Sequence, residues 1–499
     1  MSTPVAQSEL DAAFPAFHRH RKVAGAHLIT NLAGQFVFLD DEEYAAFQRG
    51  ALEPESELYQ KLAGMNFIRS EVDVDDLSSR MRDRKRFLAH GPNLHIMVVT
   101  LRCNETCAYC HASRADMSAT EKDMSKETAE KVVDLIFETT SPGITIEFQG
   151  GEPLVNYEVV KHVVEYALKK NEEAKKSLEF TMVSNLAEMD QEKLDFLVKH
   201  KVQVCTSVDG PAEIHNKQRI LPGGDSHAAA LQWIGKLNAA YEEIGLDGEV
   251  YHVEALPTVT RAALQNPEAL IDQFVDIGCK AIFLRPLDPF GFAAQTKAKL
   301  GYSPQEFLEF YARSVDYIIG LNLKGTKILE RFAGIFLTKI LGETDPNFLD
   351  IRSPCGAGIG QMAYNYDGGL FVCDEGRMLH ESGDDLFKIG EAGKDRYPEL
   401  MKHQTVRALT AASNLDTAPD CSSCAYNPYC GICPVHSYAT QGTIHGKMRL
   451  SSWCAAHMGI QDYLFGKIRE NDPEVMEVFK RWTSVRNRDH YLHTATDHA

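Results

Sequence analysis

The cysteines of this chain constrain its fold more than any other feature. Twelve are present, and ten of them fall into two groups. Cys103, Cys107 and Cys110 lie within one short segment, and seven more lie in the last third of the chain. In a reducing compartment, grouped cysteines indicate metal ligands rather than disulfides. Only Cys205 and Cys279 stand alone, in apolar segments where core packing is expected.

Composition describes an ordinary soluble chain of several domains. The 499 residues are 44% hydrophobic and 24% charged, with a net charge of −18. That charge argues against a nucleic-acid partner or an anionic membrane and favours a basic or His-rich peptide. Basic residues cluster at 18–22 and 80–86, where we expect solvated faces. Residues 1–20 lack a secretory signal and apolar runs are short, so we expect a cytoplasmic protein without membrane association.

Strand and helix patterns alternate through the centre of the chain. Six such repeats predict an α/β fold, a partial (β/α)6 TIM-like barrel with its site at the carboxyl ends of the strands. The strands are predicted at His95–Thr100, Ile144–Phe148, Leu178–Val183, Val202–Ser207, Glu249–Glu254 and Lys280–Leu284. The helices are predicted at Ser125–Thr139, Asn156–Asn171, Gln191–His200 and Arg261–Ile277.

The flanking segments predict further units. A hairpin signal followed by helices indicates a small winged-helix-like unit, which could bind a peptide at a strand edge or simply cap the barrel. We expect five regions: 1–90, the peptide-recognition-like unit; 91–303, the barrel; 304–350, bridging helices; 351–460, a metal-held cysteine-rich domain; and 461–499, a helix at Tyr463–Arg469 with a polar tail.

The first cysteine group has the spacing CxxxCxxC. Three thiolates in one loop can hold three irons of a [4Fe–4S] cluster, which leaves the fourth iron open to another ligand. A zinc site is the alternative, but zinc knuckles rarely use this spacing after a strand. With Tyr109 before the last cysteine, the motif resembles the radical S-adenosylmethionine (SAM) enzymes. The resemblance implies that SAM chelates the open iron and that its cleavage yields a 5′-deoxyadenosyl radical, which takes hydrogen from a substrate.

Other segments that follow strands resemble the family's SAM-contacting positions. The resemblance places one group near the amino end of SAM and another near its ribose and carboxylate. The alternatives are a strand-helix corner, a helix cap and a surface arginine. The residues expected to bind the cofactor are Gly150, Gly151, Glu152, Pro153, Ser184, Asn185 and Arg285.

The second cysteine group resembles the C-terminal extension called SPASM, which implies two auxiliary [4Fe–4S] clusters. Only two residues separate Cys430 from Cys433, where the family usually has three, and a zinc ribbon is the alternative. By position, the resemblance assigns one cluster to Cys421, Cys424, Cys430 and Cys454, and the other to Cys355, Cys373 and Cys433.

Two acidic residues are candidates for catalysis. Asp209 follows the fourth predicted strand and could hold substrate or take a proton, or it could serve only a turn. Asp374 follows Cys373 directly and could act as a base near an auxiliary cluster, or it could be solvated.

Segments 93–102, 146–153 and 373–378 narrow the resemblance to the maturases of His-Xaa-Ser peptide systems. This implies a ribosomally made precursor peptide, a second radical SAM maturase and an electron donor such as flavodoxin or ferredoxin, with oxidative cross-linking as one outcome. A sulfatase maturase that forms formylglycine is an alternative, against which Gln361 stands where those enzymes usually carry a cysteine. A non-enzymatic iron–sulfur or zinc scaffold is the other.

Overall fold

An eight-stranded sheet organises the molecule, in the order β10-β8-β7-β6-β4-β13-β14-β15. The computed structural model describes residues 13–342, 344–346, 348–484 and 492–493, so residues 1–12 and most of the predicted polar tail lie outside it. The first six strands in this order are parallel, and the last two are antiparallel. The strands are β4 (Leu94–Thr100), β6 (Gly143–Gly150), β7 (Ser177–Ser184), β8 (Val202–Ser207), β10 (Glu254–Leu256), β13 (Gln361–Tyr364), β14 (Gly369–Phe371) and β15 (Lys388–Glu391).

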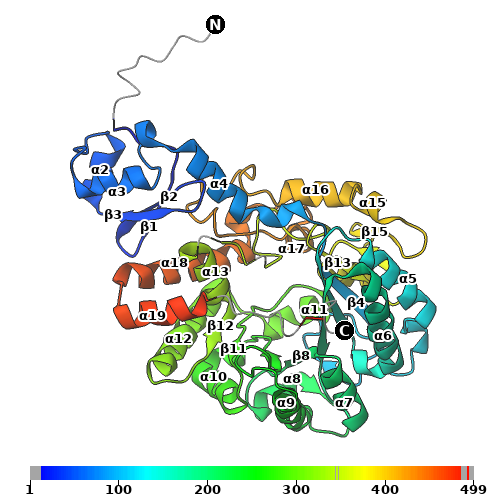
Figure 1. Ribbon diagram of the computed structural model, residues 1–499. Helices are drawn as coiled ribbons and strands as arrows, with labels where there is room; N and C mark the ends of the chain where they lie inside the picture. The colour runs from blue at the N-terminus through cyan, green and yellow to red at the C-terminus, as the bar shows by residue number, and fades with distance from the viewer. Residues whose placement is uncertain (1–12, 343, 347, 485–491, 494–499) are drawn as a thin grey trace.

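The predicted α/β repeats form, and their helices lie outside the sheet (Figure 1). The helices are α5 (Lys126–Phe137), α6 (Tyr157–Ala174), α7 (Gln191–Lys199), α8 (Ala212–Gln218), α9 (Ser226–Glu243) and α10 (Pro267–Asp276). Helix α10 begins later than predicted, because Asn266 caps it and Pro267 occupies its first turn. Parallel pairing brings the carboxyl ends of β4, β6, β7 and β8 to one edge of the sheet.

Two predicted strands differ from the structure. The fifth, β10, lies at residues 254–256 rather than 249–254, because Val250 and Tyr251 turn back to the Asp247 carbonyl. The sixth, β11 (Ala281–Ile282), pairs with β12 (Leu329–Glu330) instead of joining the main sheet. A parallel bridge between Thr258 and Arg285 connects the segments that follow β10 and β11. The partial barrel therefore extends from β10 to β11.

The bridging region is not one helical stretch. Strand β12 separates α12 (Pro304–Leu323) from α13 (Arg331–Leu341), while α11 (Gly291–Leu300) precedes both. The C-terminal helix α18 (Ser452–Glu470) is longer than the predicted Tyr463–Arg469 and is followed by α19 (Pro473–Trp482). It packs against α12, where the Tyr463 hydroxyl donates to Asp316 at 2.7 Å. The same helix carries Cys454 in its first turn.

The N-terminal unit is a three-stranded antiparallel sheet followed by helices. The predicted hairpin is β2 (Ala26–Thr30) with β3 (Phe36–Leu39), and β1 (Arg19–Val23) adds a third strand that the sequence did not reveal. Asp40 and Glu43 form a capping box that starts the next helix. The helices are α2 (Asp41–Gln48), α3 (Glu57–Gly64) and α4 (Val74–Arg84).

The two basic clusters were expected to be solvated, and for two of their arginines that is wrong. Arg19 is 3% exposed, and its guanidinium donates to the Ser422 carbonyl at 2.8 Å and to Asp416 at 3.1 Å. Arg84 is 7% exposed and donates to the Lys339 carbonyl at 2.8 Å. Both join the N-terminal unit to later segments. Arg19 does so because the alternation of β1 turns every second residue inward, and Arg84 does so from the last residue of α4.

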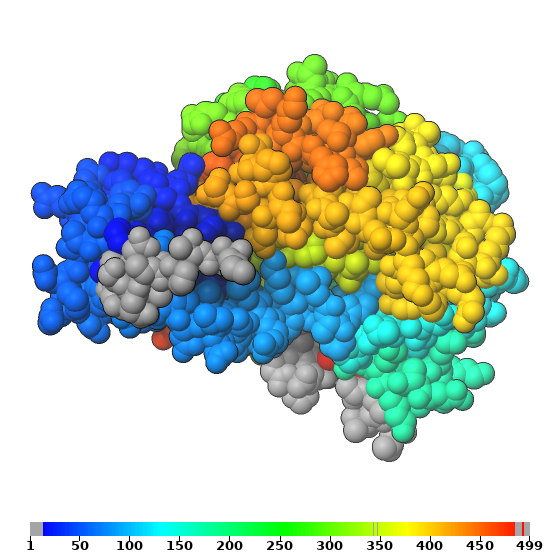
Figure 2. All heavy atoms as spheres, turned by 90° about the horizontal axis from the view of Figure 1, so that it is seen from above, coloured from blue at the N-terminus to red at the C-terminus, as the bar shows by residue number. Residues whose placement is uncertain are grey.

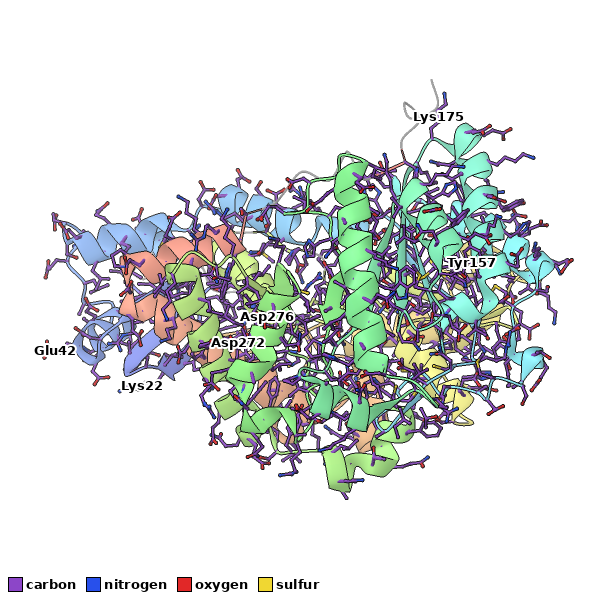
Figure 3. All side chains as sticks on the ribbon, turned by 90° about the horizontal axis from the view of Figure 1, so that it is seen from below. Lys22, Glu42, Tyr157, Lys175, Asp272 and Asp276 are labelled. Carbon is purple, nitrogen blue, oxygen red and sulfur yellow. The ribbon has the colours of Figure 1, made fainter. Side chains whose placement is uncertain are left out.

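These contacts place the N-terminal unit directly against the cysteine-rich region, as Figure 2 shows where dark blue and orange atoms adjoin. The Thr30 hydroxyl donates to the Ala425 carbonyl, and the Tyr429 hydroxyl donates to the Gly34 carbonyl, each at 2.8 Å. By contrast, Lys22 and Glu42 project from the outer end of the unit (Figure 3). No helix of the described residues has the length and apolar character needed to span a bilayer.

The cysteine-rich region continues the main sheet rather than standing apart from it. Its strand β13 pairs in parallel with β4, and a shared hydrophobic core runs from Val99 through Leu370 and Val372. Its helices are α14 (Asp374–Glu381), α15 (Tyr397–Leu400), α16 (Gln404–Ala412) and α17 (Pro434–Gln441). The fold therefore holds both cysteine groups on one framework.

Candidate active site

The first cysteine loop, residues 103–112, begins three residues after β4 ends. It thus lies at the carboxyl edge of the parallel sheet, where the sequence predicted the site. Its entry is fixed by an ion pair between Arg102 and Asp123 at 2.5 Å. All twelve cysteines of the chain are free thiols.

Gly150 and Gly151 allow the end of β6 to approach the entry of this loop. A Cβ on Gly150 would lie 2.1 Å from the Thr100 carbonyl oxygen, and one on Gly151 would lie 2.3 Å from that of Arg102. The Gly151 amide donates to Thr100 at 2.9 Å, and the Glu152 amide donates to Arg102 at 2.8 Å. The missing side chains therefore make room for neighbouring backbone, which positions the first cysteine loop.

Glu152 joins the ends of β6 and β7. It is fully buried, and its carboxylate accepts from the Leu154 amide at 3.0 Å, the Ser184 hydroxyl at 2.8 Å and the Asn185 amide at 2.7 Å. Burial raises its pKa to about 7 despite these bonds. Pro153 then begins a short 3-10 turn. The structure gives Glu152 and Ser184 bracing roles, and their contact with SAM stays a prediction.

Asn185 reaches from β7 to the cysteine loop. Its side-chain amide donates to Asn104 Oδ1 at 2.7 Å and lies 3.9 Å from the Cys103 sulfur. Asn104 in turn donates to Glu188 at 2.9 Å. Asn104 is one of the unspecified residues between the motif cysteines, so the motif did not single it out.

The three thiols of the first cysteine loop influence one another electrostatically. Burial raises the pKa of Cys103 to about 12. Burial also raises the pKa of Cys107 well above its ordinary value, although the charge of Arg219 opposes that rise. The Arg219 guanidinium lies 3.8 Å from the Cys107 sulfur. Iron must therefore displace protons when it binds, as thiolate ligation requires. Three thiols with nearby N–H donors fit one face of a [4Fe–4S] cluster.

Asp209 follows β8, and its carboxylate is engaged by protein groups. Its carboxylate accepts from the Tyr109 hydroxyl, from Arg219 Nε at 3.1 Å and from the Thr258 amide at 3.0 Å. The residue is 1% exposed. Its carboxylate therefore anchors an arginine and a motif tyrosine, and the catalytic role predicted for it receives no support from this placement.

A second group, Cys355, Cys373 and Cys433, is here called the three-cysteine group. Cys373 caps α14 and Cys433 caps α17, and their sulfurs accept from the amides of Gly376 at 3.4 Å and His436 at 3.3 Å. Burial raises the pKa of all three thiols, and each has another member of the group or the Glu375 carboxylate among its electrostatic neighbours.

Asp374 and Arg377 connect this group to the first cysteine loop. Arg377 is 1% exposed, and its Nε donates to Asp374 at 2.6 Å. Its Nη1 donates to the Ala112 carbonyl of the first cysteine loop at 3.4 Å. Asp374, like Asp209, thus holds a buried arginine. Its neighbour Glu375 has a pKa raised to about 7 by burial, with the Asp350 charge as the next cause.

The remaining four cysteines form the four-cysteine group, Cys421, Cys424, Cys430 and Cys454. Burial raises the pKa of each, and for Cys421, Cys430 and Cys454 thiols of the same group raise it further. The electrostatic neighbours of Cys430 include the other three cysteines of this group, whereas Cys433 has Cys355 among its neighbours. Among the described residues, no three His, Cys, Asp or Glu side chains gather closely enough for a single metal ion. Cluster ligation by both groups stays a prediction.

Arg285, expected at the SAM carboxylate, lies 3.8 Å from both Asp288 and Asp350. Glu375 and the Cys433 thiol are among its electrostatic neighbours. The structure therefore associates Arg285 with the three-cysteine group, and its contact with SAM is untested.

Comparison with known proteins agrees with this geometry. Residues 97–249 match the Radical SAM superfamily. A cysteine-type anaerobic sulfatase-maturating enzyme of Clostridium perfringens strain 13 is 24% identical over 381 residues, which is 73% of this chain and 94% of that protein. The radical SAM cyclopropyl synthase TigE of Paramaledivibacter caminithermalis is 24% identical over 206 residues, 38% of this chain and 41% of that protein.

Two solved structures share the fold. Native anSMEcpe with bound AdoMet has a TM-score of 0.61 at 18% identity, covering 78% of this chain and 100% of its own. Streptococcus suis SuiB bound to precursor peptide SuiA has a TM-score of 0.52 at 14% identity. The match covers 87% of this chain and 98% of the SuiB chain. Residues 97–249 therefore form a radical SAM domain, and the chain as a whole has the fold of these two solved structures.

Proposed function

We propose that this protein is a radical SAM maturase that modifies a side chain of a ribosomally made precursor peptide. The observation that carries the proposal is the buried Arg377, which joins Asp374, beside Cys373, to the first cysteine loop at Ala112. Arg377 thereby links the first cysteine loop, where SAM would bind, to the three-cysteine group. A peptide held beside these two sites would be exposed to both.

The superfamily's cofactors are SAM and [4Fe–4S] clusters, which together supply a carbon radical able to remove hydrogen from a substrate. The chain's own residues would hold and orient them. Cys103, Cys107 and Cys110 would bind the cluster that faces SAM, while the backbone at Gly150–Gly151 shapes the loop around it. The four-cysteine and three-cysteine groups would hold two auxiliary clusters, which would supply an acceptor for the second electron of an oxidation.

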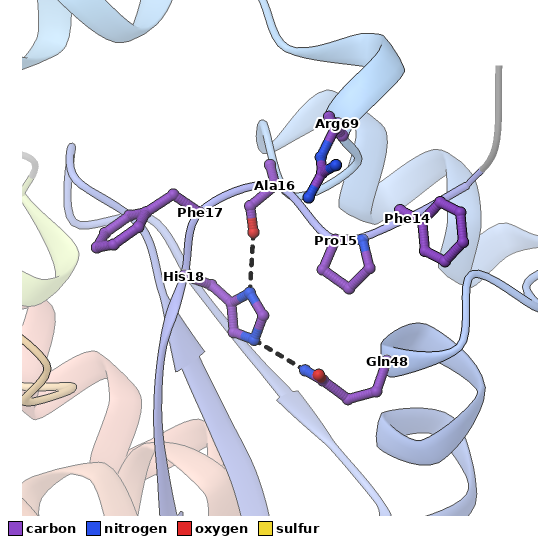
Figure 4. Close-up of a pocket in the computed structure, with 7 residues that line it drawn as sticks. All are labelled: Phe14, Pro15, Ala16, Phe17, His18, Gln48 and Arg69. Atoms are coloured by element: carbon purple, nitrogen blue, oxygen red, sulfur yellow. Dashed lines mark hydrogen bonds between the residues drawn. The ribbon is translucent and has the colours of Figure 1, made fainter. Parts of the chain in front are cut away.

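The precursor peptide is proposed to dock first on the N-terminal unit. A groove of about 540 Å³ lies there, and Figure 4 shows its lining. Phe14 and Phe17 are 40% and 56% exposed, and Arg69 adds a cation. Phe17→Asp should weaken binding of the fluorescently labelled precursor at least tenfold and leave the iron content unchanged. Equal binding by wild type and variant would exclude this groove.

Anaerobic co-expression with a candidate precursor peptide, such as any small peptide encoded next to this gene, tests the activity. Intact mass should show loss of hydrogen pairs with the wild type and no change with Cys107→Ala. Fragmentation would then locate the modified residue, which decides whether a cross-link forms. Modification that survives Cys107→Ala would overturn the radical mechanism. Omitting a second radical SAM protein, or a flavodoxin or ferredoxin, shows whether either partner is needed.

Sulfatase maturation is the second candidate, favoured by the long match to the Clostridium perfringens enzyme. Gln361 stands in β13 where the resemblance leads us to expect an extra cysteine in such enzymes, which favours the precursor peptide. A sulfatase-derived peptide with a target cysteine, incubated with reduced enzyme and SAM, should remain unchanged. Formylglycine in that peptide would instead establish the sulfatase activity. We place either reaction in the cytoplasm, where the twelve cysteines stay reduced.

A further inference from the structure

Arg219 lies opposite a cysteine of the first cysteine loop. Strand β9 (Arg219–Ile220) pairs antiparallel with β5 (Thr106–Cys107), and this register sets Arg219 across from Cys107. The Ala108 amide also donates to the Gln218 carbonyl at 2.8 Å. The backbone therefore fixes the distance between the arginine and the loop, independently of side-chain rotamers.

The side chain of Arg219 is held by an anion and directed at a sulfur. Its Nε lies 3.1 Å from Asp209 Oδ2, while its Nη1 lies 3.8 Å from the Cys107 sulfur. The guanidinium also stacks over the Tyr109 ring at 5.2 Å. The Arg219 side chain is 11% exposed and that of Asp209 is 0%, so solvent screens their charges weakly.

A hydrogen-bonded chain of buried side chains supports this arrangement from behind. The Asp209 amide donates to His215 Nδ1 at 3.2 Å, and His215 Nε2 lies 2.9 Å from the Ser226 hydroxyl. Ser226 donates to Glu105, whose other carboxylate oxygen lies 3.8 Å from the Cys107 sulfur. The network thus starts and ends on the first cysteine loop. These contacts hold the side chain of Arg219 in its orientation towards Cys107.

We propose that Arg219, anchored by Asp209, is a positioning residue that raises the reduction potential of the cluster held by the first cysteine loop. This inference rests on the proposed function only in that the loop binds a [4Fe–4S] cluster. Reduction adds negative charge to a cluster, and a fixed cation beside a ligand sulfur stabilises the reduced state. Asp209 opposes that effect by its own charge but keeps the guanidinium in place.

The test measures the reduction potential rather than turnover. Wild type, Arg219→Gln, Asp209→Asn and the double variant are reconstituted anaerobically with iron and sulfide. Iron per chain is measured, and the electron paramagnetic resonance signal that changes on addition of SAM is followed through a redox titration. Arg261→Gln serves as the control, because Arg261 is half exposed and pairs with surface Glu306 at 3.1 Å.

Arg219→Gln removes the cation and should shift the midpoint potential of the cluster to more negative values. Asp209→Asn removes the anion and should shift it to less negative values. The double variant should return towards the wild type, which general structural damage would not produce. An unchanged midpoint in Arg219→Gln with normal iron content would overturn the inference. If Arg219→Gln fails to bind iron, a midpoint of Asp209→Asn that is unchanged or more negative overturns it. A wild type that cleaves SAM but modifies no peptide would defeat only the proposed function.

Discussion

At the scale of single residues, buried carboxylates in this protein brace backbone and arginines. Asp209 and Asp374 each hold an arginine, and Glu152 accepts three hydrogen bonds from the ends of neighbouring strands. In the low dielectric of the interior, such bonds are strong and costly to leave unmade. Acids at strand ends therefore do not have to be proton acceptors, even at the edge of an active site.

Glu152 makes stability depend on pH. Its pKa is about 7 in the folded chain against an ordinary 4.5, so the folded state binds its proton more tightly. The tighter proton binding by Glu152 stabilises the folded state by an amount on the order of 3 kcal/mol. This stabilisation is fully present below about pH 4.5 and is lost as the pH rises through about 7. Glu152→Gln cannot titrate, so we expect its free energy of unfolding to fall less between about pH 5 and pH 8.

Urea unfolding of the reconstituted enzyme at a series of pH values measures this difference. Glu158→Gln is the control, because the Glu158 side chain is 72% exposed and lies 3.9 Å from Lys126. Parallel pH profiles for wild type and Glu152→Gln would contradict the raised pKa.

At the scale of elements, the end of β6 determines where the first cysteine loop begins. Gly151→Ala would put a Cβ 2.3 Å from a backbone oxygen of Arg102, so the two strands must separate. We expect a loss of stability of about 1–3 kcal/mol and fewer irons per chain. Gly143→Ala, at the other end of the same strand, meets only Ser177 at 3.7 Å and should be within about 0.5 kcal/mol of wild type. Equal iron content in the two variants would argue against this role.

Helices α14 and α17 each begin at a cysteine of the three-cysteine group. The amides of Gly376 and His436 donate to these sulfurs, and a thiolate bound to iron accepts more strongly than a thiol. Iron removal by chelation should therefore speed hydrogen exchange at both helix starts and leave the interior of β6 unchanged. Mass spectrometry of peptic fragments measures this exchange. Identical exchange with and without iron would show that the group binds none.

At the scale of the whole molecule, the N-terminal unit stabilises the cysteine-rich region. Arg19 of β1 donates to Ser422 and Asp416, and its charge acts on Cys424 of the four-cysteine group. Arg19→Ala leaves the Ser422 carbonyl without this donor, which should cost about 2 kcal/mol and reduce iron content. Lys22→Ala, on the same strand, removes a 55% exposed side chain and should change stability by less than about 0.5 kcal/mol. Thermal unfolding and iron analysis compare the two, and equal losses would show that the contact is unimportant.

Local pattern was sufficient for much of this protein. The alternation of strands and helices predicted the parallel sheet, and the CxxxCxxC spacing predicted chemistry at its carboxyl edge. The strand and helix alternation and the cysteine spacing can each be recognised from short stretches of sequence. Strand periodicity and motif spacing depend only on residues that are close together in the chain. The division of the second cysteine set into two cluster sites followed from the family resemblance and stays a prediction. Helix α18 is longer than predicted. Its buried face packs against α12, which lies far away in sequence, so the local pattern did not reveal its full length.

Tertiary structure decided the rest. The sequence alone determined the cysteine motifs and the strand ends that carry Gly150–Gly151 and Ser184–Asn185. The first cysteine loop and these strand ends lie within residues 97–249, which match the Radical SAM superfamily. Only the folded chain placed Arg219 beside Cys107, Arg377 between the two cysteine groups and β13 next to β4. These are pairings between distant segments, and no local spacing encodes them. Their partners are chosen by which buried charges the complete fold brings within reach of one another.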